Sequence, residues 1–252
     1  MGDKSAIEWT DATWNPVTGC TTISAGCDHC YARTLSNRLR AMGVVKYSNG
    51  FEVTLHPDSL GQPLRWKTPR RVFVNSMSDL FHARVPLDYV AQVWEVMQQC
   101  PQHTFQILTK RPERMARWTA ENPAPPNVWL GTSVEDGRVV GRIDRLRLCR
   151  ADVRFLSCEP LIGPLPGLDL SNIHWVIAGG ESGLEHRRIE REWVRDLRDQ
   201  CLGVAIPFFF KQWGGRTPKA GGRQLDGVTW DQIPTTPASG PLLMAEAAVL
   251  GM

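Results

Sequence analysis

The sequence lacks any apolar run long enough to cross a bilayer. Its longest apolar stretches, such as residues 205–210, have the length of a strand, whereas a membrane-spanning helix needs roughly 20 apolar residues. The polar segment 1–15 also lacks a targeting signature. We therefore expect a cytoplasmic protein with no membrane partner.

Several familiar motifs and any strong charge bias are missing as well. The glycine-rich segment 179–183 is neither a Walker loop nor a G-x-S-x-G elbow, and no H-E-x-x-H motif occurs. Lys and Arg number 29 against 26 Asp and Glu, and this net charge of +3 does not by itself indicate a nucleic-acid binder. The two most basic stretches, 65–71 and 138–150, are expected to be solvated faces.

What remains is the composition of an ordinary globular protein, with 42% hydrophobic and 22% charged residues. A chain of 252 residues is long enough to bury a full core. Segments with strand and helix patterns alternate along it. The predicted strands are a short one before Cys20, then 72–75, 104–108, 127–130, 153–156, 174–178 and 205–210. The predicted helices are 31–42, 87–99, 112–119, 137–148 and 190–201.

Such alternation implies right-handed crossovers and a parallel sheet. With about six to seven strands, it predicts an α/β fold, namely a partial or modified (β/α) TIM-like barrel. We expect the barrel to occupy residues 1–213, with a cysteine loop at 19–31 and an insertion at about 44–67. A Gly/Pro-rich extension follows at 214–252 and ends in an apolar tail, 242–252.

Polar or glycine-rich segments follow six of the predicted strands: 75–79, 109–111, 131–136, 157–160, 179–183 and 211–213. In a parallel α/β fold the active site lies at the carboxyl ends of the strands, so these segments would converge on one mouth. Taken singly, each segment is equally consistent with a polar turn or a helix cap. Charged side chains such as Lys110, Glu159 and Glu181 favour a shared site.

Three of the seven cysteines, Cys20, Cys27 and Cys30, lie within eleven residues. Three thiolates are typical of an iron-sulfur cluster that keeps one iron open. A structural zinc site is the main alternative, with its fourth ligand taken from His29, another histidine or Cys158. Unligated thiols are a further alternative. A disulfide is disfavoured, because no secretory signal is present and the number of cysteines is odd.

The cysteine loop resembles that of the radical S-adenosylmethionine (SAM) superfamily, since it is followed at once by an aromatic residue, a helix and strands with polar ends. The six residues between Cys20 and Cys27 depart from the superfamily's commonest spacing, C-x3-C-x2-C. A closer resemblance is carried by IEWTDATWNP (7–16), GCDHCYA (26–32), SMSDLF (76–81), LTKR (108–111), AGGESG (178–183) and FKQWG (210–214). These segments resemble the three-cysteine-motif family of phages, prophages and bacteria, divergent radical SAM enzymes related to spore photoproduct lyase.

The resemblance implies a [4Fe-4S] cluster held by Cys20, Cys27 and Cys30, with SAM chelating the open iron. An external one-electron donor would drive reductive cleavage of SAM to a 5′-deoxyadenosyl radical, which abstracts hydrogen from the substrate. The substrate is unknown, and the phage association of the relatives suggests DNA or RNA, as in DNA repair or nucleic-acid modification. A protein partner is also compatible with the resemblance.

The resemblance further implies roles for side chains at the strand ends. The SAM ammonium is expected at Asn75, Ser76, Ser78 or Asp79. The SAM carboxylate is expected at Lys110 or Arg111. The ribose is expected at Thr132, Ser133 and Glu135, and the adenine near His29. Contacts to cofactor or substrate are expected from Glu159, Gly180 and Glu181. Cys158 would donate a hydrogen atom to a product radical or act as a ligand.

Two other functions are compatible with the residues. One is a non-catalytic protein that binds nucleic acid or a protein partner and uses a cluster or zinc only to staple its amino-terminal loop. The other is a nuclease or nucleotide-modifying factor that binds a divalent metal through acidic strand ends. Its expected ligands are Asp79, Glu135, Glu159 and Glu181.

Overall fold

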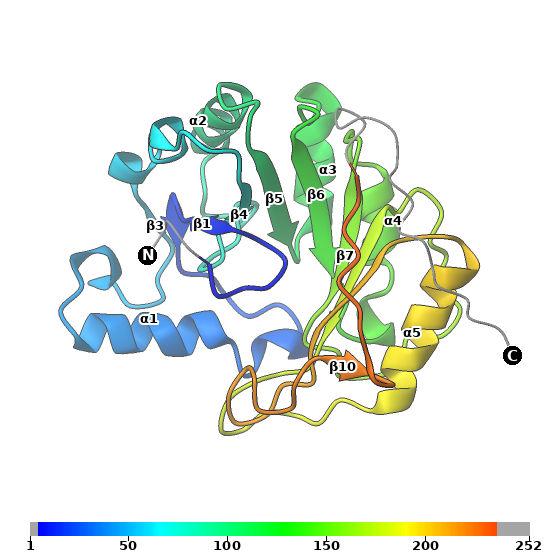
Figure 1. Ribbon diagram of the computed structural model, residues 1–252. Coiled ribbons are helices and arrows are strands. Elements are labelled where there is room, and N and C mark those ends of the chain that lie inside the picture. The colour runs from blue at the N-terminus through cyan, green and yellow to red at the C-terminus, as the bar shows by residue number, and fades with distance from the viewer. Residues whose placement is uncertain (1–4, 236–252) are drawn as a thin grey trace, which may run out of the picture.

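The computed structural model of the chain describes residues 5–235. Seven parallel strands form one sheet in the order β1-β4-β5-β6-β7-β8-β9. Their bounds are Ala12–Trp14 (β1), Arg71–Val74 (β4), Thr104–Thr109 (β5), Val128–Ser133 (β6), Arg154–Cys158 (β7), Trp175–Gly179 (β8) and Phe208–Gln212 (β9). Within the described residues β1 and β9 do not pair with each other, so the sheet is a half-barrel (Figure 1). The predicted partial TIM-like barrel is confirmed.

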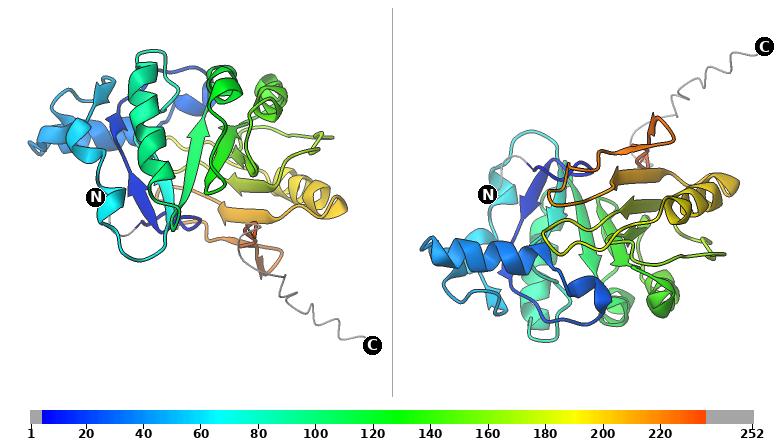
Figure 2. Two further views of the ribbon diagram at one scale, coloured as in Figure 1. Left: turned by 90° about the horizontal axis from the view of Figure 1, so that it is seen from above. Right: turned by 90° about the horizontal axis from the view of Figure 1, so that it is seen from below.

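Four helices cover the outer face of the sheet, as Figure 2 shows. They are α2 (Leu87–Gln98), α3 (Pro112–Glu121), α4 (Arg142–Arg147) and α5 (Arg191–Gly203). A fifth helix, α1 (Tyr31–Ala41), begins directly after Cys30. The arrowheads of β5 and β6 in Figure 1 point toward the end of the molecule where α1 begins. The cysteine loop therefore lies at the carboxyl ends of the strands. None of the helices in residues 5–235 is long and apolar enough to span a membrane.

Two elements differ from their predicted form. The helix expected at 137–148 is broken into a 3-10 turn at Gly137–Val139 and the short α4, because Asp136 accepts a hydrogen bond from the backbone N–H of Arg138 and starts a separate turn. The strand expected at 205–210 begins only at Phe208. Ala205 has a left-handed backbone, with φ of 56°, and Pro207 has no N–H to donate to a ladder. The expected apolar tail at 242–252 lies outside the described residues.

The expected insertion at 44–67 contains three 3-10 turns and the strand β3 (Thr54–Leu55). β3 pairs antiparallel with β2 (Val17–Thr18), which immediately precedes the cysteine loop. Gly19 then crosses the insertion so closely that a Cβ atom there would overlap the carbonyl of Glu52, and its φ of +83° also favours glycine. The insertion thus fixes the path by which the chain enters the cysteine loop.

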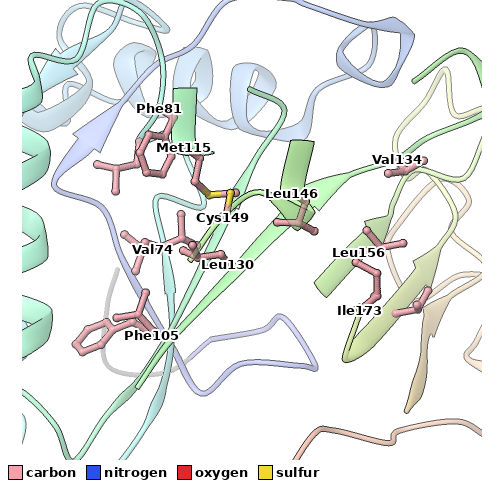
Figure 3. Close-up of a cluster of buried hydrophobic side chains, with 14 of the residues drawn as sticks. Val74, Phe81, Phe105, Met115, Leu130, Val134, Leu146, Cys149, Leu156 and Ile173 are labelled. Carbon is pink, nitrogen blue, oxygen red and sulfur yellow. The ribbon is translucent and has the colours of Figure 1, made fainter. Parts of the chain in front are cut away.

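The main core lies between the sheet and the outer helices. Side chains alternate between the two faces of a strand, and Figure 3 shows the set that faces the helices. Phe105, Leu130 and Leu156 come from three neighbouring strands and pack in one buried cluster with Met115 of α3 and Leu146 of α4. Burying each such side chain stabilises the fold by roughly 1.5–3 kcal/mol.

A second, aromatic cluster fills the concave face toward the amino ends of the strands. We call it the aromatic floor, and it consists of Trp9, Phe73, Trp129, Phe155, Trp175 and Phe209. The Trp175 ring lies at its centre, with centroid distances of 6.2 Å to Trp9, 5.8 Å to Trp129 and 5.7 Å to Phe155. Further along these strands the same face carries Ser157, two residues after Phe155, Gly179, four residues after Trp175, and Lys211, two residues after Phe209. The concave face is therefore apolar at its amino end and polar toward the carboxyl ends.

The carboxyl-terminal segment covers the free edge of β9. A hairpin of β10 (Gln224–Leu225) and β11 (Val228–Thr229) is followed by a bridge between Asp231 and Phe209. The indole N–H of Trp175 donates to the carbonyl of Gln232 over 2.8 Å. This segment thus covers part of the aromatic floor that β9 would otherwise leave open.

Substitution of Gly131 tests the packing of the floor. A Cβ atom at Gly131 would overlap the ring of Phe155, so we expect Gly131→Ala to lower the free energy of unfolding by about 1–3 kcal/mol. Gly141→Ala is the matched control, because nothing lies within 4 Å of its Cβ position and its backbone is right-handed, with φ of −57°. Urea denaturation should show the control unchanged or up to about 1 kcal/mol more stable. Equal stability of the two variants would contradict this packing.

Candidate functional site

The strand ends meet in a mouth that is rich in ion pairs. Each of four carboxylates predicted to belong to the site contacts a cation from another segment. The shortest distances are 2.8 Å for Asp79–Arg111, 2.6 Å for Glu135–Arg142, 2.5 Å for Glu159–Lys211 and 2.6 Å for Glu181–Arg187. These carboxylates are separately paired, and no three acidic, histidine or cysteine side chains within residues 5–235 gather as ion ligands. The divalent-metal nuclease hypothesis therefore gains no support.

Glu135, which follows β6, is the most buried of these carboxylates, with a side chain 1% exposed. Lys110 lies 3.0 Å from Oε1 and Arg142 lies 2.6 Å from Oε2. The hydroxyl of Ser24, in the cysteine loop, donates to Oε1. Burial alone would raise the pKa of Glu135, but Lys110, Ser24 and Arg142 together hold it below its usual value. Glu135 therefore joins the cysteine loop to β5 and α4.

Gly26 allows this contact, because a Cβ atom there would overlap the Cγ of Glu135. The loop residues around Gly26 and the residues after Glu135 line an open pocket of about 190 Å³. The cysteine loop thus lies directly against the carboxyl end of β6.

Arg111 holds the start of the cysteine loop. Its guanidinium lies 3.6 Å from Cys20 Sγ and donates to the carbonyl and hydroxyl of Thr21 over 3.1 Å. Asp79 fixes Arg111, and it also accepts hydrogen bonds from the Thr109 hydroxyl at 2.7 Å and the Phe81 N–H at 2.9 Å. Asp79 and Arg111 are paired with each other in the structure, and their predicted contacts to SAM stay predictions. The Lys110 ammonium is likewise paired, with Glu135.

Arg187 holds the middle of the loop. Its Nε and Nη2 donate hydrogen bonds to the Glu181 carboxylate over 3.0 and 2.6 Å. Nη2 also donates to the carbonyl of Ala25 over 2.9 Å. Its Nη1 lies 3.4 Å from Asp28. Burial alone would raise the pKa of Glu181, but the hydrogen bonds and charge of Arg187 hold it below its usual value. The loop is therefore fastened from β5, from β6 and from the segment after β8.

The three loop cysteines are free and half-buried. They are not gathered as a ready-made metal site within the described residues, so their side chains must turn toward one another to share a metal. The donor set fits an iron-sulfur cluster, because three soft thiol donors lie on one fastened loop and a cation faces Cys20. It fits a closed zinc site less well, since a fourth protein ligand is needed there. His29 instead faces Glu185, with Nδ1 3.6 Å from the carboxylate.

Cys158 does not join the mouth. It is fully buried in the cluster between the sheet and the helices, and the sulfur of Cys201 in α5 contributes to its surroundings. Burial raises the pKa of the Cys158 thiol, and Cys201 raises it further. Strand alternation explains this position, because the inward residues of β7 are Phe155 and Ser157. This position disfavours both the hydrogen-donor and the ligand role predicted for Cys158.

The segment after β4 is tied to the start of the cysteine loop. Asn75 has a φ of 61°, and its Oδ1 accepts a hydrogen bond from Val17 N–H, whereas its buried Nδ2 has no partner. The hydroxyl of Ser76 donates to Asn15 over 3.2 Å, and that of Ser78 donates to Val17 over 2.8 Å. The free group of Asn75 is therefore a donor, which suits an oxygen ligand rather than the predicted ammonium.

The remaining predicted residues take different positions. Thr132 is fully buried and its hydroxyl donates to the Thr109 carbonyl over 2.9 Å. Ser133 is buried beside Glu135, and its carbonyl accepts from Arg142. Gly180 passes so close to Trp213 that a Cβ atom would overlap its carbonyl. Their cofactor contacts stay predictions.

The sequence reasoning missed six residues of the site, namely Asn15, Ser24, Tyr31, Arg142, Arg187 and Lys211. Tyr31 donates to the Ser76 carbonyl over 2.5 Å. Arg142 lies in a stretch expected to be solvated, yet it is only 9% exposed, because Glu135 draws it inward. Two short spacings offered a local signal, since Arg187 comes six residues after Glu181 and Arg142 seven residues after Glu135.

Acid should weaken the link made by Glu135. Because its folded-state pKa is lowered, the stabilisation is present above the usual value of 4.5 and is lost as the pH falls through the lowered value. We expect Glu135→Gln to cost about 3 kcal/mol at about pH 7, since Lys110 and Arg142 lose a buried partner. The variant should also lose less stability than the wild type between about pH 5 and pH 3. Urea denaturation at several pH values measures both, with exposed Glu121→Gln as control.

Loss of Arg187 should loosen the cysteine loop. We expect Arg187→Gln to speed alkylation of Cys27 in the cluster-free protein at least about fivefold, the effect of about 1 kcal/mol. Arg187→Lys should restore part of the protection. The control is Arg188→Gln, whose side chain is 86% exposed. Mass spectrometry after pulsed alkylation gives the rates, and equal rates in both glutamine variants would show that Arg187 does not fasten the loop.

Solved structures of spore photoproduct lyase, a radical SAM enzyme, share this fold at low identity. The complex with a dinucleoside spore photoproduct superposes with a TM-score of 0.51 and 13% identity, over 79% of this chain and 63% of that chain. A cysteine-to-serine mutant gives a TM-score of 0.50 and 14% identity, over 83% of this chain and 58% of that chain. A double mutant with bound AdoMet and the dinucleoside gives a TM-score of 0.48 and 14% identity, over 79% and 63%.

At this identity the likeness shows the fold, and the chain spans about 63% of the length of the lyase that it matches. No curated protein matches the sequence. The narrower identification with the three-cysteine-motif family of phages stays a prediction. A family profile does match residues 4–234, nearly the whole chain, and its description is "Protein of unknown function (DUF5131)". The chain therefore belongs to the DUF5131 family.

Proposed function

We propose that the protein is a radical SAM-type enzyme in which Cys20, Cys27 and Cys30 hold a [4Fe-4S] cluster. The observation that carries this proposal is the fastening of a three-thiol loop across the mouth of a parallel half-barrel. The fold shared with spore photoproduct lyase supports it. When bound, the cluster would supply the electron for reductive cleavage of SAM, replenished by an external one-electron donor.

The chain's own residues would prepare the site for this chemistry. Burial and the nearby Asp79 carboxylate raise the pKa of the Cys20 thiol, and the Arg111 guanidinium offsets part of that shift by favouring the thiolate, the form that ligates iron. Ser24 and Arg187 would keep the loop over the mouth while the thiols bind. The aromatic floor excludes water from the amino end of the half-barrel. The charges of the adjoining mouth therefore interact more strongly than they would in bulk water.

The positions of the polar side chains revise how SAM would be recognised. Asp79 and Arg111 are committed to each other, so they shape the mouth rather than bind the methionyl group. The unpartnered Nδ2 of Asn75 suits the SAM carboxylate. On the far side, Glu159 and Lys211 pack over Gly179, where they would face the substrate. We propose DNA or RNA as the substrate class.

Anaerobic reconstitution tests the proposal. The full chain is treated with iron and sulfide, reduced, and incubated with SAM. We expect about four irons per chain, an electron paramagnetic resonance signal that changes when SAM is added, and release of 5′-deoxyadenosine. Cys27→Ala should abolish the cluster while its circular dichroism stays that of the wild type. Cys158→Ala should keep the cluster, because Cys158 lies in the core.

Three results would overturn the proposal. Stoichiometric zinc without iron-dependent absorbance would show that the cysteines bind structural zinc and not a cluster. A cluster whose spectrum ignores SAM would favour the non-catalytic binding protein. Global unfolding of Cys27→Ala would show that the centre is structural.

A further inference from the structure

Arg223, in the segment that covers the edge of β9, carries a guanidinium without a polar partner. Its Cζ lies 5.1 Å from the centroid of the Phe209 ring, which belongs to the aromatic floor. Both Nε and Nη2 are buried and form no hydrogen bond. Among the arginines of residues 5–235, only Arg223 has buried side-chain nitrogens left unpartnered in this way.

The two unpartnered nitrogens form one edge of the guanidinium. The N–H bonds of Nε and Nη2 point in the same direction, and this edge binds two oxygens of a carboxylate or phosphate at once. The same protein uses the edge elsewhere. Arg187 binds both oxygens of Glu181 through it, and Arg195 binds Asp226 through it, over 3.1 and 2.5 Å. Arg223 has the same edge and no carboxylate.

Such an arrangement is costly for the ligand-free fold. The two buried N–H groups of Arg223 forfeit their hydration without gaining an acceptor, whereas most buried polar groups have partners. The contact with Phe209 offsets part of this cost through a cation–π interaction. It leaves the two N–H groups unsatisfied, so packing alone does not explain the position of the guanidinium.

The location connects Arg223 to the proposed active site. Phe209 and Lys211 are on the concave face of the same strand, and Lys211 is already held by Glu159. Arg223 as a whole is half-buried, at the margin of the segment over β9. It directly follows Gly221 and Gly222, whose backbone groups hydrogen-bond to Gly214, Trp213 and Lys219, so a ligand reaches the buried Nε and Nη2 only when the Arg223 side chain itself turns outward.

We propose that the Nε/Nη2 edge of Arg223 binds an oxyanion of the substrate, a phosphate or a carboxylate. The assignment of this group to the substrate rests on the proposed function, whereas binding of the anion itself requires neither cluster nor SAM. Arg223 would thus anchor the substrate at the β9 edge, beside the Glu159–Lys211 pair.

Anion titration of the full-length, cluster-free protein tests the proposal. The probes are inorganic phosphate, acetate and a 5′-phosphorylated single-stranded DNA oligonucleotide, and the readout is the ¹⁵Nε–¹H signal of Arg223 together with calorimetry. We expect saturable binding that Arg223→Gln weakens at least tenfold. Arg216→Gln, an exposed arginine of the same segment, should change affinity less than twofold.

The probes separate the two sources of an oxyanion. Binding of phosphate and the oligonucleotide without acetate assigns a phosphate, and binding of acetate alone assigns a carboxylate. Failure of all three probes to move the Arg223 signal would overturn the proposal. Equal weakening in the Arg216 variant would also overturn it, because that result indicates diffuse surface charge.

Thermal unfolding gives an independent readout. Removing an unpartnered buried charge should not destabilise the ligand-free protein, so we expect Arg223→Met to keep or raise Tm. A clear fall in Tm would assign the guanidinium a structural role and overturn the proposal. The outcome is separate from that of the proposed function. If the protein binds anions through Arg223 but takes up zinc and not iron, the radical SAM assignment is wrong and the anion site stands.

Discussion

The site depends on the burial of one carboxylate, that of Glu135. A charge removed from water must be matched nearby, and Lys110 from β5, Arg142 from α4 and Ser24 from the cysteine loop converge on it. These three partners come from segments far apart in the sequence. Through Ser24, this anchor holds the cysteine loop against the end of β6, together with the contacts that Arg111 and Arg187 make to the loop.

The concave face of the sheet has an apolar end and a polar end. Aromatic rings fill its amino end and exclude water, with Trp175 at their centre. Toward the carboxyl ends the same strands carry Ser157, Gly179 and Lys211, and the ion pairs begin. Electrostatic interactions strengthen next to such an apolar floor. A half-barrel also leaves an open edge at β9, and the segment that contains Arg223 and Trp230 covers this edge.

Local patterns predicted most of the fold. A short run with Phe105 and Ile107 marks β5, and the spacing of Val90, Val93 and Met97 marks α2, because these patterns depend only on neighbouring residues. The predicted start of β9 was wrong, because the left-handed backbone of Ala205 and the missing N–H of Pro207 delay the strand to Phe208. The face of Cys158 was also missed, since a shift of one residue along a strand moves a side chain from the mouth to the core.

The sequence by itself determined the parallel half-barrel, the polar strand ends and the three thiols on one loop. It did so because hydrophobic periodicity and cysteine spacing are local properties. Only the tertiary structure decided the partners of each charge. It paired Asp79 with Arg111, drew Arg142 inward to Glu135, and left the Nε/Nη2 edge of Arg223 without a carboxylate. Such pairings join residues from separate segments, and burial selects among them only once the strands have met.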